Sequence, residues 1–279
     1  MIKYYTRACN FYFGSISLEK VEKKQSIPLH GNRLISFDTI EILTRKKIKR
    51  ININKIKKLK KNLKKKVLTD IENIFKKKKF KGLNFSHLPI LMGVLNLTPD
   101  SFSDGGKFNK NNKSLKRISE MILSGANIID VGGESTRPGS KTINSEVEWK
   151  RVQFVIKRFK KKYKKISLSI DTRKSDVMIK SINRGVDLIN DVSGFNYDQN
   201  ALSKLKKYNI AKVLHHMQGT PNTMQINPKY KNVLLDIYDF FEKSIKTNFD
   251  NKKIILDPGI GFGKNLKHNL TLISKISLF

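Results

Sequence analysis

Aspartate and asparagine side chains follow several apolar runs in the second half of this sequence. Asp171 follows SLSI, Asn190 follows DLI, and Asp257 follows KIIL. A carboxylate accepts two N–H bonds in one plane, and an amide both donates and accepts. Three such groups around one opening would bind a flat heterocycle that is rich in N–H donors. Taken singly, each is also a residue that caps the following helix.

A charge-free loop follows another apolar run. Asn96 ends the run MGVLN, where its amide oxygen can face a ligand or a hard cation. Pro99 and the two glycines at 105–106 then predict a loop that moves. Phe102 on this loop can close over a flat ligand. The alternative is a capping asparagine followed by an ordinary turn.

The segment GGESTRPGS (132–140) is a second loop with candidate binding groups. Its paired glycines allow the backbone to approach a ligand closely. Thr136 and Arg137 supply a hydroxyl and a guanidinium, which suit an anion or an aromatic ring. The alternative is a turn that carries a surface arginine.

Other candidate motifs are weaker. GIGFGK (259–264) lacks the spacing of a phosphate-binding P-loop. His215 and His216 are adjacent, and neighbours on a strand point to opposite faces, so one metal ion shared between them is disfavoured. Met217 suits the soft wall of a pocket under a flat ring. The sequence offers no Ser-His-Asp or Cys-His arrangement for covalent catalysis.

Strands that alternate with helices must position these groups. Apolar runs separated by stretches of helical period, such as 114–125 and 144–159, indicate a parallel sheet with helices outside. Polar residues at the ends of all the runs favour a (β/α)₈ barrel over a doubly wound sheet. The six predicted strands are 89–97, 127–133, 166–172, 187–194, 211–219 and 253–259.

The number of units is short of a closed barrel. Six β/α units lie between 89 and 279, whereas a closed barrel has eight. The missing pair would need about 60–75 further residues. Six strands alone would expose two sheet edges and an unclosed core. We therefore expect either a fragment or a further element that covers the gap.

Residues 1–88 differ from the barrel segment 89–279 and predict a small α+β accessory region. Residues 9–18 and 33–43 alternate apolar and polar residues, as half-buried strands do. Residues 56–82 repeat apolar positions every three or four residues between lysines, which predicts an amphipathic helix ending near Gly82. A helix that covers a neighbouring domain is favoured over a nucleic-acid or membrane-surface helix, because the stripe is narrow and poor in aromatics.

The composition favours a cytoplasmic protein of high positive charge. The net charge of +34 fits nucleic-acid binding, but abundant Lys, Ile and Asn also fit an A+T-rich codon bias, which we favour. Lysines such as those in 157–165 are then expected on solvated helix faces, with no specific nucleic-acid partner. Cys9 is alone, so no disulfide framework is expected. No stretch approaches the roughly 18 apolar residues of a membrane span.

Six motifs together resemble the dihydropteroate synthase family, in the family's order. They are LNLTPDSFSDGG, DVGGESTRPGS, SIDT, INDVSG, HMQGTP and LDPGIGFGKN, and they span about 89–276. The resemblance implies a (β/α)₈ barrel that joins 4-aminobenzoate to 6-hydroxymethyl-7,8-dihydropterin diphosphate and releases diphosphate. It also implies Mg²⁺ as cofactor, a homodimer, and a target of sulfonamides.

The resemblance also implies roles for individual residues. Asn96 matches the residue associated with Mg²⁺ and diphosphate. Asp171, Asn190 and Asp257 match residues that bind the pterin, and Met217 and Phe262 match walls of its pocket. The residues that match the two mobile loops near the diphosphate and aminobenzoate are Phe102, Thr136, Arg137 and Pro138. Among these, Asn96, Arg137 and Asp171 are the candidates for catalysis.

Two departures from the family pattern stand out. His215 occupies a position where the family usually has methionine. The family's Ser-Arg-Lys and Arg-x-His motifs, after the seventh and at the eighth strand, have no counterpart before Phe279. We therefore expect a sequence truncated at its C-terminus, with little activity and poor folding of the 279 residues by themselves. The alternatives are an inactive truncated homologue and a related pterin-binding methyltransferase-type domain. The loop at 98–106 argues against the methyltransferase-type alternative.

Overall fold

The computed structural model describes residues 2–84, 89–98, 107–135, 140–248 and 253–279. Their contacts form two compact units, each described here by itself. The N-terminal unit contains Met1–Lys78, Tyr230–Asp239 and Leu270–Phe279, and the barrel unit contains Lys79–Lys229 and Phe240–Asn269. The boundary at 88/89 that the composition suggested stays a prediction.

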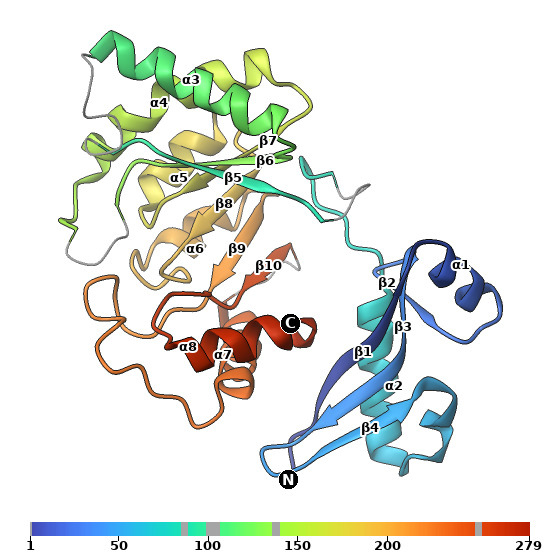
Figure 1. Cartoon of the computed structure of the whole chain (residues 1–279). Helices are drawn as coiled ribbons and strands as arrows, with labels where there is room; N and C mark the ends of the chain where they lie inside the picture. Colours follow the sequence, from blue (N-terminus) through green and yellow to red (C-terminus); the bar gives the residue numbers. More distant parts are fainter. Residues whose placement is uncertain (1, 85–88, 99–106, 136–139, 249–252) are drawn as a thin grey trace. The chain divides into compact units, whose positions relative to one another are not determined.

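The barrel unit is built on a sheet of six parallel strands in sequential order (Figure 1). These are β5 (Met92–Asn96), β6 (Ile128–Gly132), β7 (Ser167–Asp171), β8 (Leu188–Asp191), β9 (Ala211–His215) and β10 (Ile254–Asp257). The predicted parallel α/β sheet is therefore confirmed, and all six predicted strands are present. Each strand is shorter than its predicted range, because the predicted ranges also included flanking residues that lie in loops.

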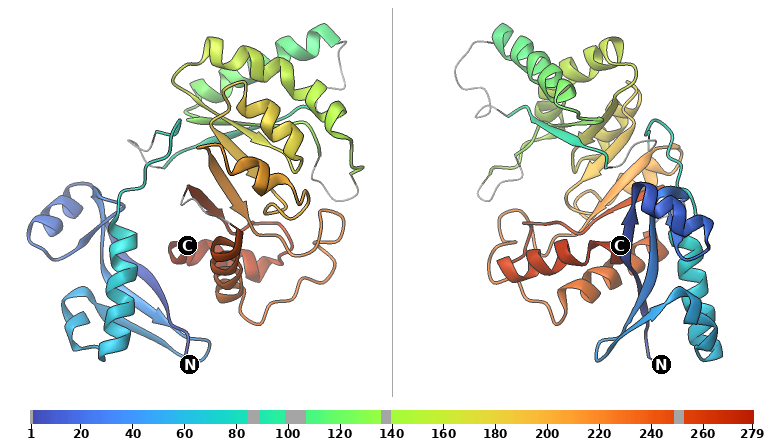
Figure 2. Two further views of the ribbon diagram at one scale, coloured as in Figure 1. Left: turned by 180° about the vertical axis from the view of Figure 1, so that it is seen from behind. Right: turned by 45° about the vertical axis from the view of Figure 1, so that its right-hand side comes forward.

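A helix follows each strand in the sequence, and the helices between β5 and β9 cover the outer face of the sheet (Figures 1 and 2). Their bounds are α3 (Lys107–Leu123), α4 (Ser145–Lys162), α5 (Ser175–Ile182), α6 (Ala201–Leu205), α7 (Val233–Asn248), α8 (Leu266–Ser274) and the 3₁₀ turn η3 (Ile276–Leu278). Asn144 caps α4 by accepting from the Val147 N–H at 2.9 Å. The helix predicted at 114–125 corresponds to α3, and the two C-terminal ends differ by two residues. The helix predicted at 144–159 corresponds to α4, and the two N-terminal ends differ by one residue.

Apolar side chains from the segment before the first strand of the sheet pack against β8 and β9. Phe80 and Leu83 pack against Leu188, Ala211 and Val213. The Ser167 hydroxyl donates to the Gly82 carbonyl at 2.6 Å and ties this segment to β7. Gly82 has φ +81°, and an added Cβ would lie 2.5 Å from a carboxylate oxygen of Asp187, so only glycine fits here. The segment is therefore fixed against the sheet by packing and by a hydrogen bond.

The N-terminal unit carries an antiparallel sheet in the order β1-β3-β2, with β4 also paired to β3. Its elements are β1 (Tyr5–Phe13), α1 (Gly14–Glu22), β2 (Ile27–Leu29), β3 (Asn32–Leu43), β4 (Ile48–Asn52), η1 (Ile53–Lys58) and α2 (Lys61–Phe75). The predicted strand at 33–43 is confirmed. The one predicted at 9–18 is wrong beyond Phe13, because Gly14 at φ +60° ends β1 and starts α1.

The lysine-rich helix is shorter than the predicted range 56–82. Leu59 is extended, with ψ 149°, and separates η1 from α2. α2 ends at Phe75, before four consecutive lysines at 76–79. Val67 and Ile71 are buried against Phe37 and Ile40 of the antiparallel sheet. The apolar stripe of α2 is therefore used to cover the sheet of its own unit.

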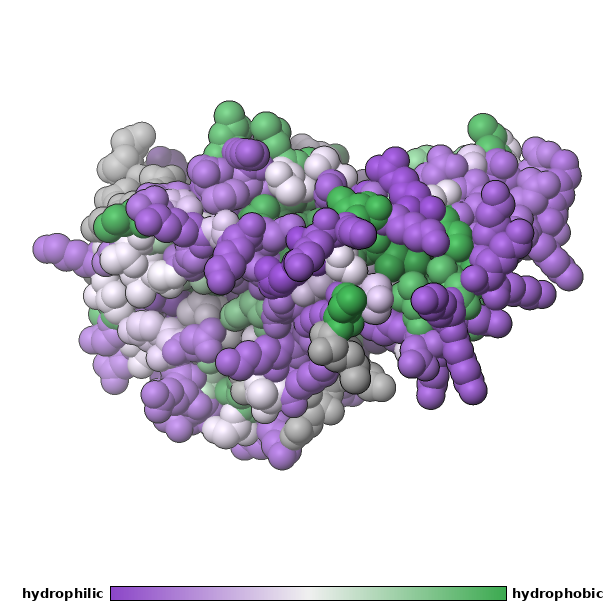
Figure 3. Space-filling model, turned by 90° about the horizontal axis from the view of Figure 1, so that it is seen from below, coloured by the Kyte–Doolittle hydropathy of each residue, from purple (hydrophilic) through white to green (hydrophobic). Residues whose placement is uncertain are grey.

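Much of the lysine is exposed. Lysines 157, 161, 162, 164 and 165 of the predicted solvated face are exposed, and Lys160 is half-buried beside Asp187. Hydrophilic side chains predominate on the face shown in Figure 3. Within the described ranges, every helix is too short or too polar to cross a membrane.

Candidate functional site

Four of the strand-end positions form one row across the sheet. Asn96 pairs with Gly132, Gly132 with Asp171, and Asp171 with Asn190. Paired residues of neighbouring parallel strands point to the same face, so these side chains share one side of the sheet. The structure therefore places Asn96, Asp171 and Asn190 together, as their positions at the strand ends predicted.

Gly132 leaves room between Asn96 and Asp171. A Cβ at Gly132 would lie 3.2 Å from the Asn96 amide oxygen and 3.5 Å from the Asp171 Oδ2. The Asn96 and Asp171 oxygens therefore face the space that a side chain at position 132 would fill. A group with N–H donors or positive charge would be stabilised there, because both neighbours are acceptors.

The surroundings of Asp171 disfavour the negative charge of its own carboxylate. Burial raises the pKa of Asp171 well above its usual value, and the charges of Asp130 and Asp191 raise it further. The residue nonetheless keeps a partly exposed surface. A ligand that donates N–H bonds to this carboxylate would relieve the cost of ionising it.

Asn190 is held from below by a buried carboxylate. Its Nδ2 donates to Asp130 Oδ2 at 2.8 Å. Asp130 is 2% exposed, and burial raises its pKa, while hydrogen bonding from Ser169 and Asn190 opposes that shift. The amide of Asn190 therefore has one fixed contact on the protein side, and the residue itself is half-buried.

His215, Asp257 and Phe262 meet at the next strand ends. Asp257 pairs with His215 across β9 and β10, and its Oδ2 lies 3.9 Å from His215 Nε2. The Phe262 ring packs edge-on against the His215 ring, 4.9 Å between centroids. Burial lowers the pKa of His215, against the opposing charge of Asp257, so a neutral imidazole is favoured. The Asp257 side chain is 44% exposed and remains accessible to a ligand.

The two adjacent histidines contact different groups. His215 Nδ1 lies 2.8 Å from the Val192 carbonyl. The His216 ring packs on Phe240, and its Nδ1 lies 3.3 Å from the ammonium of Lys264. Burial lowers the pKa of Lys264 to about 8, against the charge of Asp257. Among the described residues, no cluster of three His, Cys, Asp or Glu side chains that could hold a metal ion is found.

Glycine is required beside these side chains. A Cβ on Gly259 would lie 2.0 Å from the His216 carbonyl oxygen, and its φ is +69°. The Gly259 N–H donates to Asp257 Oδ1 at 2.8 Å. The DPG turn thus fixes the Asp257 carboxylate through a backbone conformation that other residues rarely adopt.

Buried ion pairs and a backbone N–H hold Glu134 of the GGESTRPGS segment. Glu134 accepts from Arg173 Nη2 at 2.8 Å, from Lys174 Nζ at 2.9 Å and from the Ile143 N–H at 3.1 Å. Lys174 also donates to Glu148 at 2.6 Å. Residues on both sides of 136–139 are therefore tied to the turn that follows β7.

The roles of five predicted site residues stay predictions. Met217, two residues after β9, is half-buried, so its position as a pocket wall stays a prediction. The four loop candidates lie outside the described residues, and their roles also stay predictions: Phe102, Thr136, Arg137 and Pro138.

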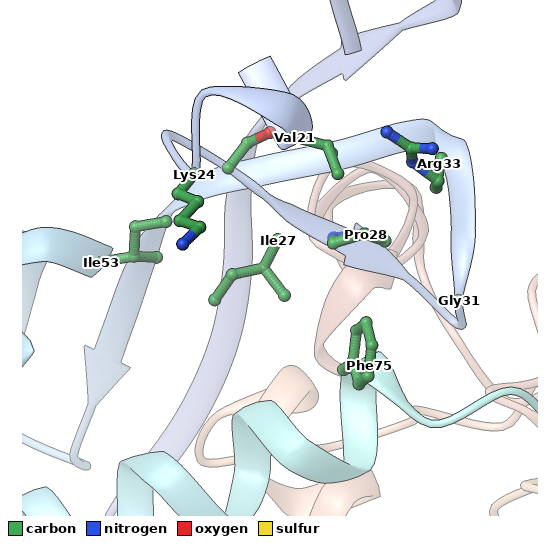
Figure 4. Close-up of a pocket in the computed structure, with 9 residues that line it drawn as sticks. Val21, Lys24, Ile27, Pro28, Gly31, Arg33, Ile53 and Phe75 are labelled. Atoms are coloured by element: carbon green, nitrogen blue, oxygen red, sulfur yellow. The ribbon is translucent and has the colours of Figure 1, made fainter. Parts of the chain in front are cut away.

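A separate cavity of about 570 Å³ lies in the N-terminal unit (Figure 4). Its walls are mostly apolar, with Ile27, Pro28 and Phe75 among them. Lys24 and Arg33 contribute the cations. This cavity lacks the row of carboxylate and amide acceptors found at the strand ends, so the strand-end row remains the candidate site.

Sequence reasoning left some buried charges out of the site. Asp130, Glu134 and Lys174 belong to the motifs DVGGE and DTRK, and all three are buried. These residues could have been identified from the sequence, because each is a charged residue inside or beside an apolar strand. A charge in that position is seldom buried without a partner, so it indicates a buried ion pair or hydrogen bond. Asp191 carries the same signal, and burial raises its pKa to about 6.

Comparison with known families covers the barrel segment. The family described as pterin binding enzyme matches residues 92–279. A dihydropteroate synthase of Escherichia coli K12 is 41% identical over 202 residues, which cover 71% of each chain. One from Clostridium beijerinckii is 42% identical over 200 residues, covering 70% of this chain and 71% of that one.

Solved structures give the same result. The dihydropteroate synthase of Yersinia pestis in a sulfonamide drug complex superposes with a TM-score of 0.63 at 39% identity, covering 71% of this chain and 74% of that one. The enzyme of Burkholderia cenocepacia complexed with 7,8-dihydropteroate gives 0.60 at 34% identity, covering 70% and 67%. The likeness confirms the expected barrel-type architecture.

Proposed function

The chain belongs to the dihydropteroate synthase family of pterin-binding enzymes, and from that premise we propose its reaction. It joins 4-aminobenzoate to 6-hydroxymethyl-7,8-dihydropterin diphosphate and yields 7,8-dihydropteroate and diphosphate. The observation that carries the proposal is the row of acceptors at the strand ends, Asn96, Asp171 and Asn190. Asp257 adds a further exposed carboxylate.

The pterin ring binds through its N–H donors. Asp171, Asn190 and Asp257 accept hydrogen bonds from these donors. Asp171 and Asn190 lie directly side by side in the sheet. Phe262 and Met217 form walls for the flat ring. The raised pKa of Asp171 supports this role, because N–H donors compensate the burial that disfavours its charge.

Asn96 binds the cation that accompanies the diphosphate. Asn96 is exposed and its amide oxygen is a hard ligand, and a carboxylate oxygen of Asp171 lies across Gly132 from it. Mg²⁺ suits this set, since it usually binds one or two protein oxygens together with substrate phosphates. When bound, Mg²⁺ takes up the negative charge that develops on the leaving diphosphate.

The remaining chemistry needs orientation and exclusion of water. The arylamine is itself the nucleophile and attacks the exocyclic CH₂ carbon as the C–O bond to diphosphate breaks. Its surplus proton leaves with the products. Arg137 and Thr136 bind the anionic groups, and Phe102 and Pro138 cover the aminobenzoate. Keeping water away matters, because water competes for the same carbon.

The reaction is proposed to occur in the cytoplasm, supported by the single cysteine. The partners are small-molecule substrates, and a homodimer stays a prediction from the family. A pterin-binding methyltransferase-type domain is the second candidate. It would share Asp171 and Asn190 but would not need to accommodate an aminobenzoyl group.

Competition between ligands separates the two candidates. Fluorescence titration of the chain with 6-hydroxymethylpterin measures ring binding. We expect 7,8-dihydropteroate to displace it fully, because the product occupies the same ring site and extends towards the loops. Ring binding without displacement by the product would favour the methyltransferase-type site, and absence of ring binding would contradict both.

A further inference from the structure

Asp130 lies one layer below the acceptor row of the candidate site. In β6 it is two residues before Gly132, so both residues face the same side of the sheet. Its partner in the register is Ser169 of β7. Both side chains are almost completely buried. Asp130 therefore sits in the barrel interior beneath the proposed ring site and is not part of the exposed rim.

The polar atoms of this layer have few protein partners. Asp130 Oδ2 accepts from Asn190 at 2.8 Å. Asp130 Oδ1 and the Ser169 hydroxyl make no well-aligned hydrogen bond among the described residues, although the Ser169 hydroxyl is near enough to Asp130 to lower the pKa of that carboxyl. A buried carboxylate with one satisfied oxygen has a strong electrostatic preference for the N–H group that reaches it.

That preference fixes the orientation of the Asn190 amide. An amide has a donor end and an acceptor end of nearly the same shape, and only the NH₂ end can donate to a carboxylate. With the NH₂ turned towards Asp130, the Asn190 oxygen is free for the ligand. Asn190 and Asp171 then both present acceptors from neighbouring strands. A reversed amide would instead offer a donor beside Asp171.

We propose that Asp130 is a positioning residue that holds the Asn190 amide with its oxygen towards the ligand, and thereby makes the site prefer a 2-amino heterocycle to its 2-oxo counterpart. The inference rests on the proposed function, since it assumes that the ligand is a pterin. Asp130 acts through Asn190 and is not itself placed in contact with the ring.

The test compares two ligands on the full 279-residue chain. The probes are 6-hydroxymethylpterin and 6-hydroxymethyllumazine, which has a carbonyl where the pterin has its 2-amino group. Dissociation constants are measured by fluorescence titration for wild type, Asp130→Leu and Asp130→Asn. Ser169→Ala serves as the control, because it changes a neighbour of Asp130 in the same buried layer and leaves both members of the Asp130–Asn190 bond in place. Thermal melting identifies any variant that fails to fold.

The ratio of the two dissociation constants decides the outcome. We expect wild type to favour the pterin, and Asp130→Leu to reduce that preference by about fivefold or more, because the amide becomes free to turn. Asp130→Asn should reduce it less, and provides the test if the leucine variant does not fold. Ser169→Ala should keep the wild-type ratio.

Two outcomes would count against different claims. If folded Asp130 variants keep the wild-type ratio, or lose affinity for both ligands equally, Asp130 does not set the orientation and the inference fails. If wild type binds neither heterocycle, the proposed function fails instead.

Discussion

At the scale of single residues, adjacent glycines 132 and 133 have different tasks. Gly132 separates two oxygens of the candidate site, with Asn96 and Asp171 at 3.2 and 3.5 Å from an added Cβ. Gly133 faces the helix layer, where a Cβ would lie 2.9 Å from Val152 Cγ1 and 3.0 Å from the Glu148 carbonyl. One glycine thus opens space for a ligand, and the other allows close packing of α4.

Alanine at each position distinguishes these tasks. We expect Gly132→Ala to weaken binding of 6-hydroxymethylpterin by several fold while changing the free energy of unfolding little, because its neighbours need to move only slightly. Gly133→Ala should instead destabilise the fold by about 1–3 kcal/mol through overpacking. Titration and urea unfolding measure the two effects. Equal loss of stability in both variants would contradict the distinction.

Asp191 predicts a specific pH dependence of stability. Burial raises its pKa to about 6, from an ordinary value of 3.8. Between these values the folded state binds a proton that the unfolded state does not, so the contribution of Asp191 to stability falls as the pH rises from about 4 to about 6. Compared with Asp191→Asn, wild type should lose about 1–3 kcal/mol across this window.

Urea unfolding at several pH values measures this difference. Comparison of the two proteins removes the titration of the groups that Asp191 does not influence. Asp171, whose pKa is raised by the charge of Asp191, titrates differently in the variant, so the difference reports on this pair of carboxyls. A constant difference in unfolding free energy between pH 4 and pH 6 would contradict the shifted pKa of Asp191.

At the scale of elements, the turn between β7 and α5 is stabilised by buried charge. Lys174 contacts Glu134 at 2.9 Å and Glu148 at 2.6 Å, and all three side chains are at most 10% exposed. Lys174→Met removes the cation and leaves two buried carboxylates without it. We expect a loss of about 3–5 kcal/mol in unfolding free energy.

An exposed lysine provides the control for this loss. Lys161 lies on the solvated face of α4, and Lys161→Met should change the unfolding free energy by less than about 0.5 kcal/mol. If the two methionine variants unfold at the same urea concentration, the buried pairs do not stabilise the turn.

The sequence predicted these elements to different degrees. Strands β5 to β10 were predictable because apolar runs broken by helical periods have few other solutions. The strand at 9–18 and the helix at 56–82 were mispredicted because each depended on one backbone conformation, at Gly14 and at Leu59. Periodicity carries no information about such single angles.

The site was predicted only in part, for a related reason. That Asn96, Asp171 and Asn190 end strands follows from the sequence, and so does their gathering at one edge. The register that sets them side by side with Gly132 depends on the pairing of strands, which the order of residues leaves open. The bond between Asn190 and Asp130 depends on the same register.

At the scale of the whole molecule, a net charge of +34 raises the question of a polyanionic partner. The lysines along α4 are exposed, and α2 uses its apolar side chains to pack on its own sheet. Neither helix therefore offers a surface of aromatic side chains on which nucleic-acid bases could stack. We expect only weak binding to duplex DNA, with dissociation constants of about 10⁻⁴–10⁻⁶ M at physiological salt and no sequence preference. Binding tighter than about 10⁻⁸ M in a filter assay would contradict this.

The most direct test of the central claim is calorimetric titration of the chain with 6-hydroxymethylpterin. We predict binding by wild type that Asp171→Asn weakens by about 1.5–3 kcal/mol, because the variant loses a charged acceptor of N–H donors. Asp176→Asn, on the surface of α5, should bind like wild type. Absence of wild-type binding, or equal affinity of wild type and Asp171→Asn, would contradict a pterin site at the strand ends.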